Sequence, residues 1–329
     1  MSGRDRFGDR FGRTGRRLAR AAAWLAVLLL AASCGFVGNG RDQTFGGSED
    51  KIRVVTTIAQ IAEPLSVIGG DRVAVQSLMG PGVDPHLYQA APSDIRKLAN
   101  ADAVFYNGLH LEANMLRVFE ELGKAVPVLA IAETIPEEEL LRDEQGAIDP
   151  HVWFDIGLWK KALAAAVEEL KRISPRDAAY FEANKAAYFA RMDALRKEAE
   201  EMVAQIPEKQ RVLVTAHDAF GYFGRMLGLR VVGLQGLSTE DEVGLTNIDN
   251  TIELLAEYQV PAVFVESSVN PAAIRAVIEG AKERGLNVRP GGELFSDAMG
   301  TAGTEEGTYL GMFRHNVETI TRALSGGEG

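Results

Sequence analysis

The chain has 329 residues, 46% of them apolar, a single cysteine and a formal net charge of −11 at pH 7. This length and apolar content allow a large core and favour two globular domains over one. The acidic balance argues against nucleic acid as a partner, and the lack of any internal repeat of roughly 20 to 50 residues argues against a solenoid.

The amino-terminal segment has the pattern of an export signal. Residues 1–33 contain seven arginines, which precede an apolar run from Ala21 to Ala32. A membrane-spanning helix needs about 20 apolar residues. This shorter run, which ends in small residues, therefore predicts a signal peptide over 1–33.

Cys34 follows the apolar run in a sequence that resembles a bacterial lipoprotein cleavage box. We predict lipidation of Cys34, an extracytoplasmic location at the cell surface or in the periplasm with a membrane anchor, and a flexible tether over 34–50. Cleavage near Ser33 with an incidental cysteine and twin-arginine export through Arg16 and Arg17 are the alternatives. A lone cysteine excludes an internal disulfide, so packing must supply the stability.

Residues 51–174 are predicted to form a first α/β domain. Short apolar runs alternate with helical patterns, which predicts a parallel sheet flanked by helices. The predicted strands are Ile52–Thr57, Val73–Met79, Ala103–Tyr106 and Val126–Ile131. The predicted helices are Pro64–Ile68, Ser93–Asn100 and Glu112–Lys124.

Residues 175–206 are predicted to form one unbroken long helix. Apolar residues recur there at helical spacing, at Phe181, Tyr188, Met192, Leu195, Ala199, Met202 and Ile206. At 1.5 Å per residue the helix would be about 48 Å long, more than the width of a small domain. It is therefore predicted to link two domains, with a surface helix of one domain as the alternative.

Residues 207–329 are predicted to form a second α/β domain. The predicted strands are Arg211–Thr215, Val231–Leu234 and Ala262–Glu266, and the predicted helices lie near Phe220–Leu227, Ile248–Tyr258, Ala272–Arg284 and Tyr309–Leu324. The predicted fold class is therefore α/β, with two parallel-sheet domains joined by one long helix.

Two of the five histidines, His86 and His151, stand at the end of the same tripeptide, Asp-Pro-His. The proline restricts the local backbone, which lowers the entropy cost of presenting the imidazole. His86 also follows a turn after a predicted strand, and open α/β sheets bind ligands at the carboxyl ends of their strands. Both histidines are candidate ligands.

Two more candidate ligands come from the last third of the chain. His217 follows a predicted strand, and Asp297 ends the segment Gly291–Asp297. Together with His86 and His151 they supply the four donors of a closed tetrahedral zinc-type site. Glu266 ends another predicted strand and is predicted to hydrogen-bond a ligating imidazole, with a purely structural role as the alternative.

The remaining histidines, His110 and His315, are predicted to be non-ligands because neither has a partner at ligand spacing. Trp153 and the Tyr222–Phe223 pair are predicted to pack between the two domains rather than to recognise a ligand.

Five motifs of the chain are Pro81–Tyr88, Ala101–Gly108, Asp149–Trp153, Ala216–Phe223 and Glu293–Asp297. They resemble the motifs of the metal-binding lipoproteins of bacterial importers in the ATP-binding-cassette (ABC) class, also called cluster A-I or class C solute-binding proteins, and among them the TroA-like zinc and manganese binders of treponemes. The resemblance covers nearly all of 51–324. It places metal ligands at the positions of His86, His151, His217 and Asp297.

The resemblance implies a substrate-binding component that captures Zn²⁺ or Mn²⁺ between two domains. It would deliver the ion to the membrane permease of the importer, and its partners would be this permease and, through the permease, an ATPase. We further expect a monomer with no enzymatic activity.

The resemblance leaves the metal open. Manganese-dedicated relatives typically have glutamate at the position of His217, and dedicated zinc relatives typically have a long histidine-rich loop before the second ligand. Here the corresponding stretch, Glu137–Ile148, is acidic and has no histidine. Three imidazoles favour zinc, because manganese is the weakest binder of the first-row divalent series. We predict zinc or manganese, with zinc slightly ahead in vitro.

Three other functions compete with metal transport. A zinc hydrolase would keep one coordination position open for water and would need a general base, whereas Asp297 fills the fourth position. A surface adhesin is a second alternative, but no motif encodes a specific host ligand. A siderophore or corrinoid binder would not need three histidines.

Overall fold

The computed structural model describes residues 50–326, which all belong to one compact unit, residues 48–329. The predicted signal peptide, Cys34 and all but the last residue of the predicted tether over 34–50 lie outside the described residues. Within residues 50–326 no helix is both long and apolar enough to cross a membrane.

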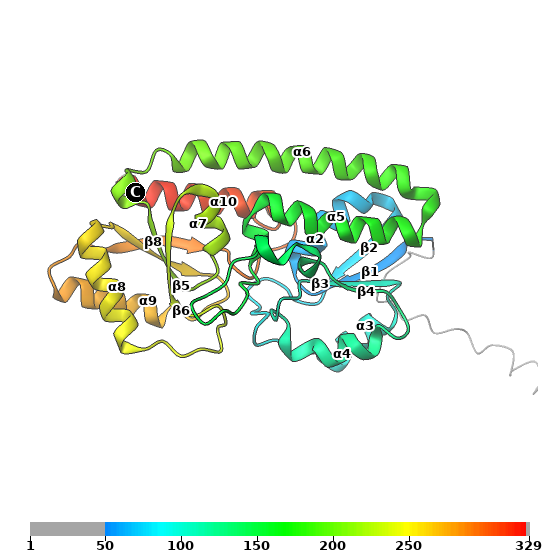
Figure 1. Cartoon of the computed structure of the whole chain (residues 1–329), viewed down its shortest axis with the longest axis horizontal. Helices are drawn as coiled ribbons and strands as arrows, with labels where there is room; N and C mark the ends of the chain where they lie inside the picture. Colours follow the sequence, from blue (N-terminus) through cyan, green and yellow to red (C-terminus); the bar gives the residue numbers. More distant parts are fainter. Residues whose placement is uncertain (1–49, 327–329) are drawn as a thin grey trace, which may run out of the picture. The chain divides into compact units, whose positions relative to one another are not determined.

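The first sheet has four parallel strands in the order β2-β1-β3-β4 (Figure 1). Its strands are β1 (Ile52–Thr56), β2 (Val73–Ser77), β3 (Ala103–Tyr106) and β4 (Val128–Ala130). Val54 of the central strand β1 lies opposite Val75 and Ala103, and it is fully buried because helices cover a parallel sheet on both faces. All four predicted strands are present, with ends that differ by at most two residues.

Four helices accompany this sheet: α2 (Ala59–Gly69), α3 (Pro92–Ala99), α4 (Leu116–Leu122) and α5 (Ile156–Ile173). The predicted start of the first of them at Pro64 is wrong, because α2 begins five residues earlier and contains Pro64. Ile61, Leu65 and Ile68 form one fully buried stripe. Their packing stabilises the turn before Pro64 despite the hydrogen bond that proline cannot donate.

Helix α5 is absent from the sequence-based prediction, which was wrong for this segment. Its start is capped by Asp155, whose carboxylate accepts hydrogen bonds from the backbone amides of Gly157 and Leu158 at 2.9 and 3.1 Å. Its apolar stripe, which includes Leu163 and Val167, is fully buried. Both the cap and the stripe are visible in the sequence.

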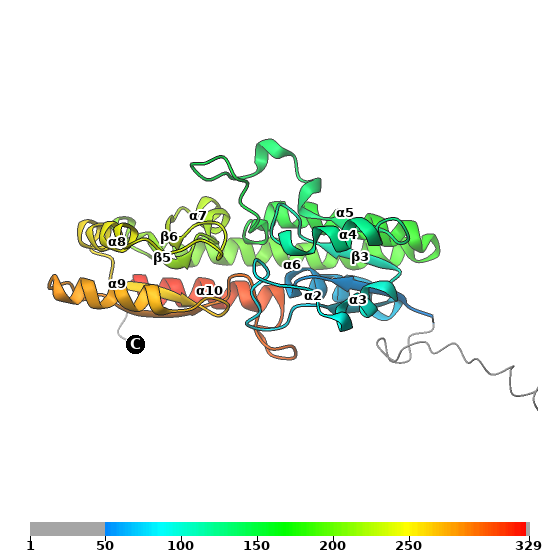
Figure 2. The same cartoon turned by 90° about the horizontal axis from the view of Figure 1, so that it is seen from below.

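The predicted long helix is present but is not unbroken. A 3₁₀ turn over Pro175–Asp177 precedes α6 (Ala178–Val203), which at 26 residues is about 39 Å long. Its buried stripe packs against α2 and α5 from the first part of the chain and against α7 (Gly221–Leu227) and α10 (Tyr309–Leu324) from the last. Both views show α6 beside α10 and α5 (Figures 1 and 2).

The segment after α6 forms two parallel strand pairs, β5 (Val212–His217) with β6 (Arg230–Gln235) and β7 (Ala262–Glu266) with β8 (Arg289–Leu294). Helices α7, α8 (Leu245–Tyr258), α9 (Ala272–Glu283) and α10 accompany them. These sheets, their helices and the long helix confirm the predicted α/β class. The division into domains at 174 and 206 remains a prediction.

Strand β8 is a second element that the sequence analysis does not predict. Its sequence contains Pro290, Gly291 and Gly292 and has no alternating apolar pattern. A Cβ at Gly291 would lie 2.5 Å from the ring of Phe264, so β8 can approach β7 this closely only because glycine has no side chain. A tertiary contact, rather than local preference, therefore decides this strand.

Candidate metal centre

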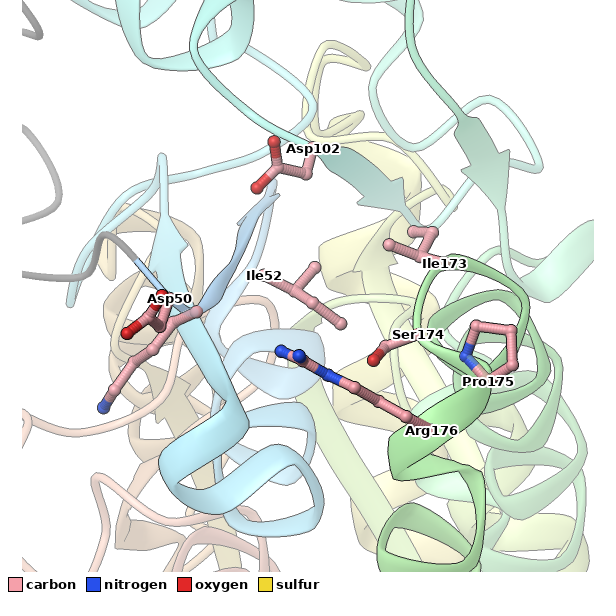
Figure 3. A pocket seen from close by; sticks show the side chains of 8 residues that line it. Asp50, Ile52, Asp102, Ile173, Ser174, Pro175 and Arg176 are labelled. Carbon is pink, nitrogen blue, oxygen red and sulfur yellow. The ribbon is translucent and has the colours of Figure 1, made fainter.

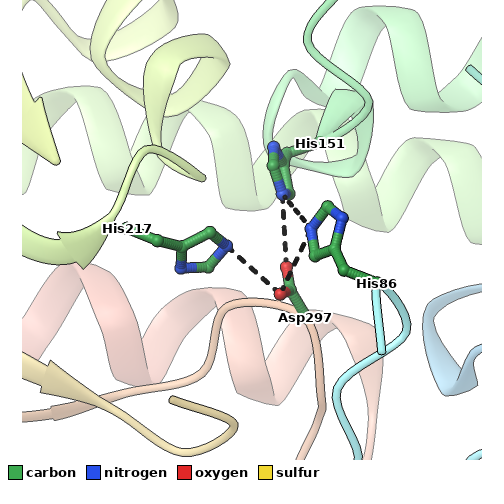
Figure 4. Close-up of side chains that lie close together, drawn as sticks. All are labelled: His86, His151, His217 and Asp297. Carbon is green, nitrogen blue, oxygen red and sulfur yellow. Dashed lines mark hydrogen bonds and ion pairs between the residues drawn. The ribbon is translucent and has the colours of Figure 1, made fainter. Parts of the chain in front are cut away.

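Four buried side chains from four separate segments converge at one point (Figure 4). His86 follows β2, His151 precedes a 3₁₀ turn over Val152–Phe154, His217 is the last residue of β5, and Asp297 follows β8. Each is at most 5% exposed. Two of the segments precede α6 and two follow it, and three of them lie at the carboxyl ends of parallel strands.

The distances between the donor atoms are those of a small coordination cage. His86 Nε2 lies 3.3 Å from His151 Nε2, and the Asp297 oxygens lie 3.2 Å from His217 Nε2, 3.4 Å from His151 Nε2 and 3.7 Å from His86 Nε2. Four donors placed about 2.05 Å from a tetrahedral ion would be about 3.3 Å apart. The four residues thus have the spacing of a tetrahedral site.

Asp149 fixes the tautomer of His151. Its Oδ1 atom lies 2.7 Å from Nδ1 of His151 and also accepts a hydrogen bond from the backbone amide of His151 at 2.9 Å. A carboxylate can only accept, so the ring proton sits on Nδ1 and the lone pair of Nε2 faces the centre. Asp149 was not among the residues predicted from the sequence, although its place in the Asp-Pro-His tripeptide was a usable signal.

Glu266 stands in the same relation to His217. Its Oε2 atom lies 2.6 Å from Nδ1 of His217, and its Oε1 atom accepts a hydrogen bond from the backbone amide of His217 at 2.9 Å. Both residues are buried, and each ends one of two neighbouring strands, β5 and β7. This carboxylate therefore directs Nε2 of His217 at the centre.

The first Asp-Pro-His tripeptide is held differently. Asp84 accepts a hydrogen bond from the backbone amide of His86 at 2.9 Å, but its other oxygen accepts one from the hydroxyl of Thr239, beyond β6, at 2.6 Å. Burial lowers the pKa of His86 to about 3. This imidazole is therefore neutral and able to donate a lone pair over the whole physiological pH range.

The carboxylates beside His217 favour the protonated form of its imidazole. Burial alone would lower the pKa of His217, but the carboxylates of Glu266 and Asp297 raise it well above its usual value. The pKa of Asp297, which burial alone would raise, is held well below its usual range by the three histidines. Within the described residues, both Asp297 oxygens are buried without a hydrogen-bond partner. Such a donor set fits a divalent cation.

Metal binding is therefore expected to release about one proton near pH 7. The folded-state pKa of His217 is raised, so at pH 7 its imidazole is protonated and the metal must displace that proton. Affinity should then fall about tenfold for each pH unit of acidification. Calorimetric zinc titrations in two buffers of different ionisation enthalpy measure the number of protons released, and a value near zero would contradict this assignment.

The other residues singled out in the sequence are placed as follows. His110 is exposed, and Nε2 of His315 lies 3.0 Å from the carbonyl oxygen of Glu293. Neither belongs to the four-residue group. Tyr222 and Phe223 are fully buried, the first donating a hydrogen bond to the carbonyl of Asp149 at 3.0 Å.

A surface hollow of about 470 Å³ lies away from this centre (Figure 3). It is lined by Asp50, Lys51, Ile52, Asp102, Ile173, Ser174, Pro175 and Arg176. These residues surround the amino end of β1, whereas the four converging side chains lie at the carboxyl ends of strands. The hollow and the candidate metal centre are therefore separate features.

The chain is similar to proteins that are named for metal binding. It is 48% identical to the manganese-binding lipoprotein MntA of Bacillus subtilis over 301 residues, which cover 91% of this chain and 98% of MntA. It is 45% identical to the zinc-binding protein TroA of Treponema pallidum over 278 residues, which cover 84% and 90% of the two chains. The solved structure of the periplasmic zinc-binding protein TroA superposes with a TM-score of 0.81 over 83% of this chain and 99% of TroA.

The fold, the buried donor group and these relatives define a substrate-binding protein of the metal ABC transporter class. The family model described as "Zinc-uptake complex component A periplasmic" matches residues 54–323. The chain belongs to this family, the ZnuA family.

Proposed function

We propose that this protein captures Zn²⁺ or Mn²⁺ with His86, His151, His217 and Asp297 and delivers the ion to the membrane permease of an ABC importer, which an ATPase drives. The single observation that carries the proposal is the convergence of three buried imidazole nitrogens and one buried carboxylate. Four distances between these donor atoms range from 3.2 to 3.7 Å. The names of the relatives, manganese-binding MntA and zinc-binding TroA, support it.

The same donor set favours transport over catalysis. A catalytic zinc site keeps a position open for water, whereas four protein donors close the tetrahedron. The protein is therefore proposed not to be an enzyme. The relatives described above are named for metal binding and not for hydrolysis or adhesion.

Zinc is proposed to bind more tightly than manganese in vitro. Three neutral imidazoles suit zinc. Manganese prefers six oxygen ligands in octahedral geometry and is the weakest binder of the first-row divalent metals. The metal carried in the cell also depends on availability. The proposal therefore includes both ions, with zinc slightly ahead.

The proposed cycle uses the metal as a bridge between two lobes, residues 51–174 and 207–329, which α6 limits to a modest closure. Two of the proposed ligands come from each lobe, so a bound ion stabilises the closed form by about 2.7 kcal/mol at a free-ion concentration of 100 times Kd. Docking on the permease would separate the lobes and weaken coordination. The protein is further proposed to act as a monomer, tethered outside the cytoplasm through a lipid on Cys34.

A competition titration tests the proposed function. Metal-free protein is titrated with zinc and with manganese against a chromophoric chelator, and the bound metal is counted by elemental analysis. One ion per chain and tighter binding of zinc are expected. Binding of neither ion, or chelator-resistant binding of several ions per chain, would refute the proposal.

A further inference from the structure

We propose that Trp153 is a positioning residue that fixes the carboxylate of Asp297 relative to the imidazole of His151, and that it thereby determines how strongly the centre prefers a tetrahedral metal such as zinc over manganese. This inference rests on the proposed function of the centre. It assigns to Trp153 a role beyond the packing that its sequence context predicts.

Trp153 contacts two of the segments that supply donors. Its indole nitrogen donates a hydrogen bond at 3.2 Å to the carbonyl oxygen of Ser296, the residue directly before Asp297. Its ring also packs edge-on against the imidazole of His151, with 5.3 Å between the ring centroids and 76° between the planes. One fully buried side chain therefore joins the second proposed ligand to the peptide that carries the fourth.

The carbonyl of Ser296 is held by a second donor from the first part of the chain. The side-chain amide of Gln60, in α2, donates to it at 3.3 Å and is itself fully buried. The donors on Trp153 and Gln60 both precede α6 in the chain, whereas Asp297 follows it. Besides Asn316 of α10, which holds the backbone of Phe295, the peptide before Asp297 is thus held by residues from the same part of the chain as His86 and His151.

Trp153 is in turn fixed by hydrogen bonds that reach α6. The hydroxyl of Tyr309 donates to the carbonyl of Trp153 at 2.8 Å, and the backbone amide of Tyr309 donates to Glu63 at 3.1 Å. The same carboxylate oxygen of Glu63 accepts a hydrogen bond from the hydroxyl of Tyr188, in α6, at 2.7 Å. Because these groups are largely buried, water does not readily replace the bonds, and the indole is a rigid support.

A rigid Asp297 favours zinc because of the geometry that each ion prefers. Zinc takes four donors at the corners of a tetrahedron, whereas manganese favours an octahedral, oxygen-rich shell. A carboxylate that is free to turn can offer both oxygens or admit water, which suits manganese. Release of the Ser296 carbonyl should therefore weaken zinc binding more than manganese binding.

The test compares Trp153→Phe with Trp159→Phe. Each change makes a fully buried tryptophan side chain smaller. The two tryptophan rings are neighbours, with 6.4 Å between their centroids. Of the two indole nitrogens, only that of Trp153 donates to the Ser296 carbonyl, since that of Trp159 is buried without a hydrogen-bond partner in the part of the chain that the structure describes. Zinc and manganese affinities of the wild type and both variants are measured by chelator competition, with thermal unfolding of the metal-free proteins as a check on folding.

The expected result is a zinc affinity about 10 to 100 times lower in Trp153→Phe, the usual effect of losing a residue that supports a metal ligand, with a smaller change for manganese. The ratio of the two affinities should stay at the wild-type value in Trp159→Phe. A merely structural role would lower both affinities alike or neither, so an unchanged ratio in Trp153→Phe overturns the inference.

Two further outcomes are also decisive. If Trp153→Phe does not fold, Gln60→Met removes the other donor to the same carbonyl, and it must lower the zinc-to-manganese ratio or the inference fails. If the wild type itself binds neither ion, the proposed function fails and the inference fails with it. If the wild type binds zinc and Trp153→Phe keeps the wild-type ratio of zinc to manganese affinity, the inference fails while the proposed function stands.

Discussion

Replacement of His217 by alanine is expected to lower the zinc affinity by more than about 100-fold. Loss of a residue that only supports a ligand costs about 10- to 100-fold, and His217 is proposed to coordinate the ion itself. The change also leaves the buried carboxylates of Glu266 and Asp297 without their cationic neighbour, so the metal-free variant should be less stable. Circular dichroism verifies folding before chelator competition measures the affinity.

A histidine outside the centre is the matched control. His110→Ala removes an exposed imidazole that is not part of the four-residue group, and its zinc affinity should equal that of the wild type. Asp297→Asn keeps the size of the side chain while removing its charge and should also lower the affinity strongly. Wild-type zinc binding in a folded His217→Ala variant would remove His217 from the proposed site.

The second large effect is expected from Phe154→Ala, which should lower the free energy of unfolding by about 3 to 5 kcal/mol. Phe154 is fully buried and stacks on Phe220 with 4.6 Å between the ring centroids. It also contacts Phe223 in α7 and Phe313 in α10. The cavity left by its ring would therefore lie between a segment that precedes α6 in the chain and segments that follow it.

Urea unfolding of the metal-free protein measures this loss. The control is Phe189→Ala, since Phe189 is only half-buried on α6 and alanine has a high helix propensity. This variant should lose clearly less stability than Phe154→Ala. Equal losses in the two variants would show that the aromatic cluster around Phe154 does not form a well-packed part of the core.

The sequence predicts the convergence of the four donors better than it predicts the elements around them. His86 and His217 were identified because they come after predicted strands, and the carboxyl ends of parallel strands meet at one edge of a sheet. Glu266 was predicted to support a ligating imidazole and lies against the ring of His217, but the orientation of the two Asp-Pro-His histidines was not predicted. Asp84 and Asp149 each begin one of the two Asp-Pro-His tripeptides, yet only Asp149 contacts the ring of its histidine, whereas Asp84 accepts a hydrogen bond from the hydroxyl of Thr239.

The missed elements have two different physical origins. For α5, the capping residue Asp155 and the apolar stripe were readable, so local information sufficed. For β8, glycine is needed at Gly291 because a side chain there would collide with the ring of Phe264 in β7, and such a contact is invisible in a single segment. The hydrogen bond from Trp153 to Ser296 likewise spans 143 residues. No spacing rule reports a contact of that kind.

The most direct test of the central claim is anomalous diffraction from crystals of the zinc-loaded protein, recorded at the zinc absorption edge. We expect one strong peak per chain, about 2.0 to 2.2 Å from Nε2 of His86, His151 and His217 and from an oxygen of Asp297. A peak at any other position, or a zinc ion whose ligands exclude two or more of these four residues, would contradict it.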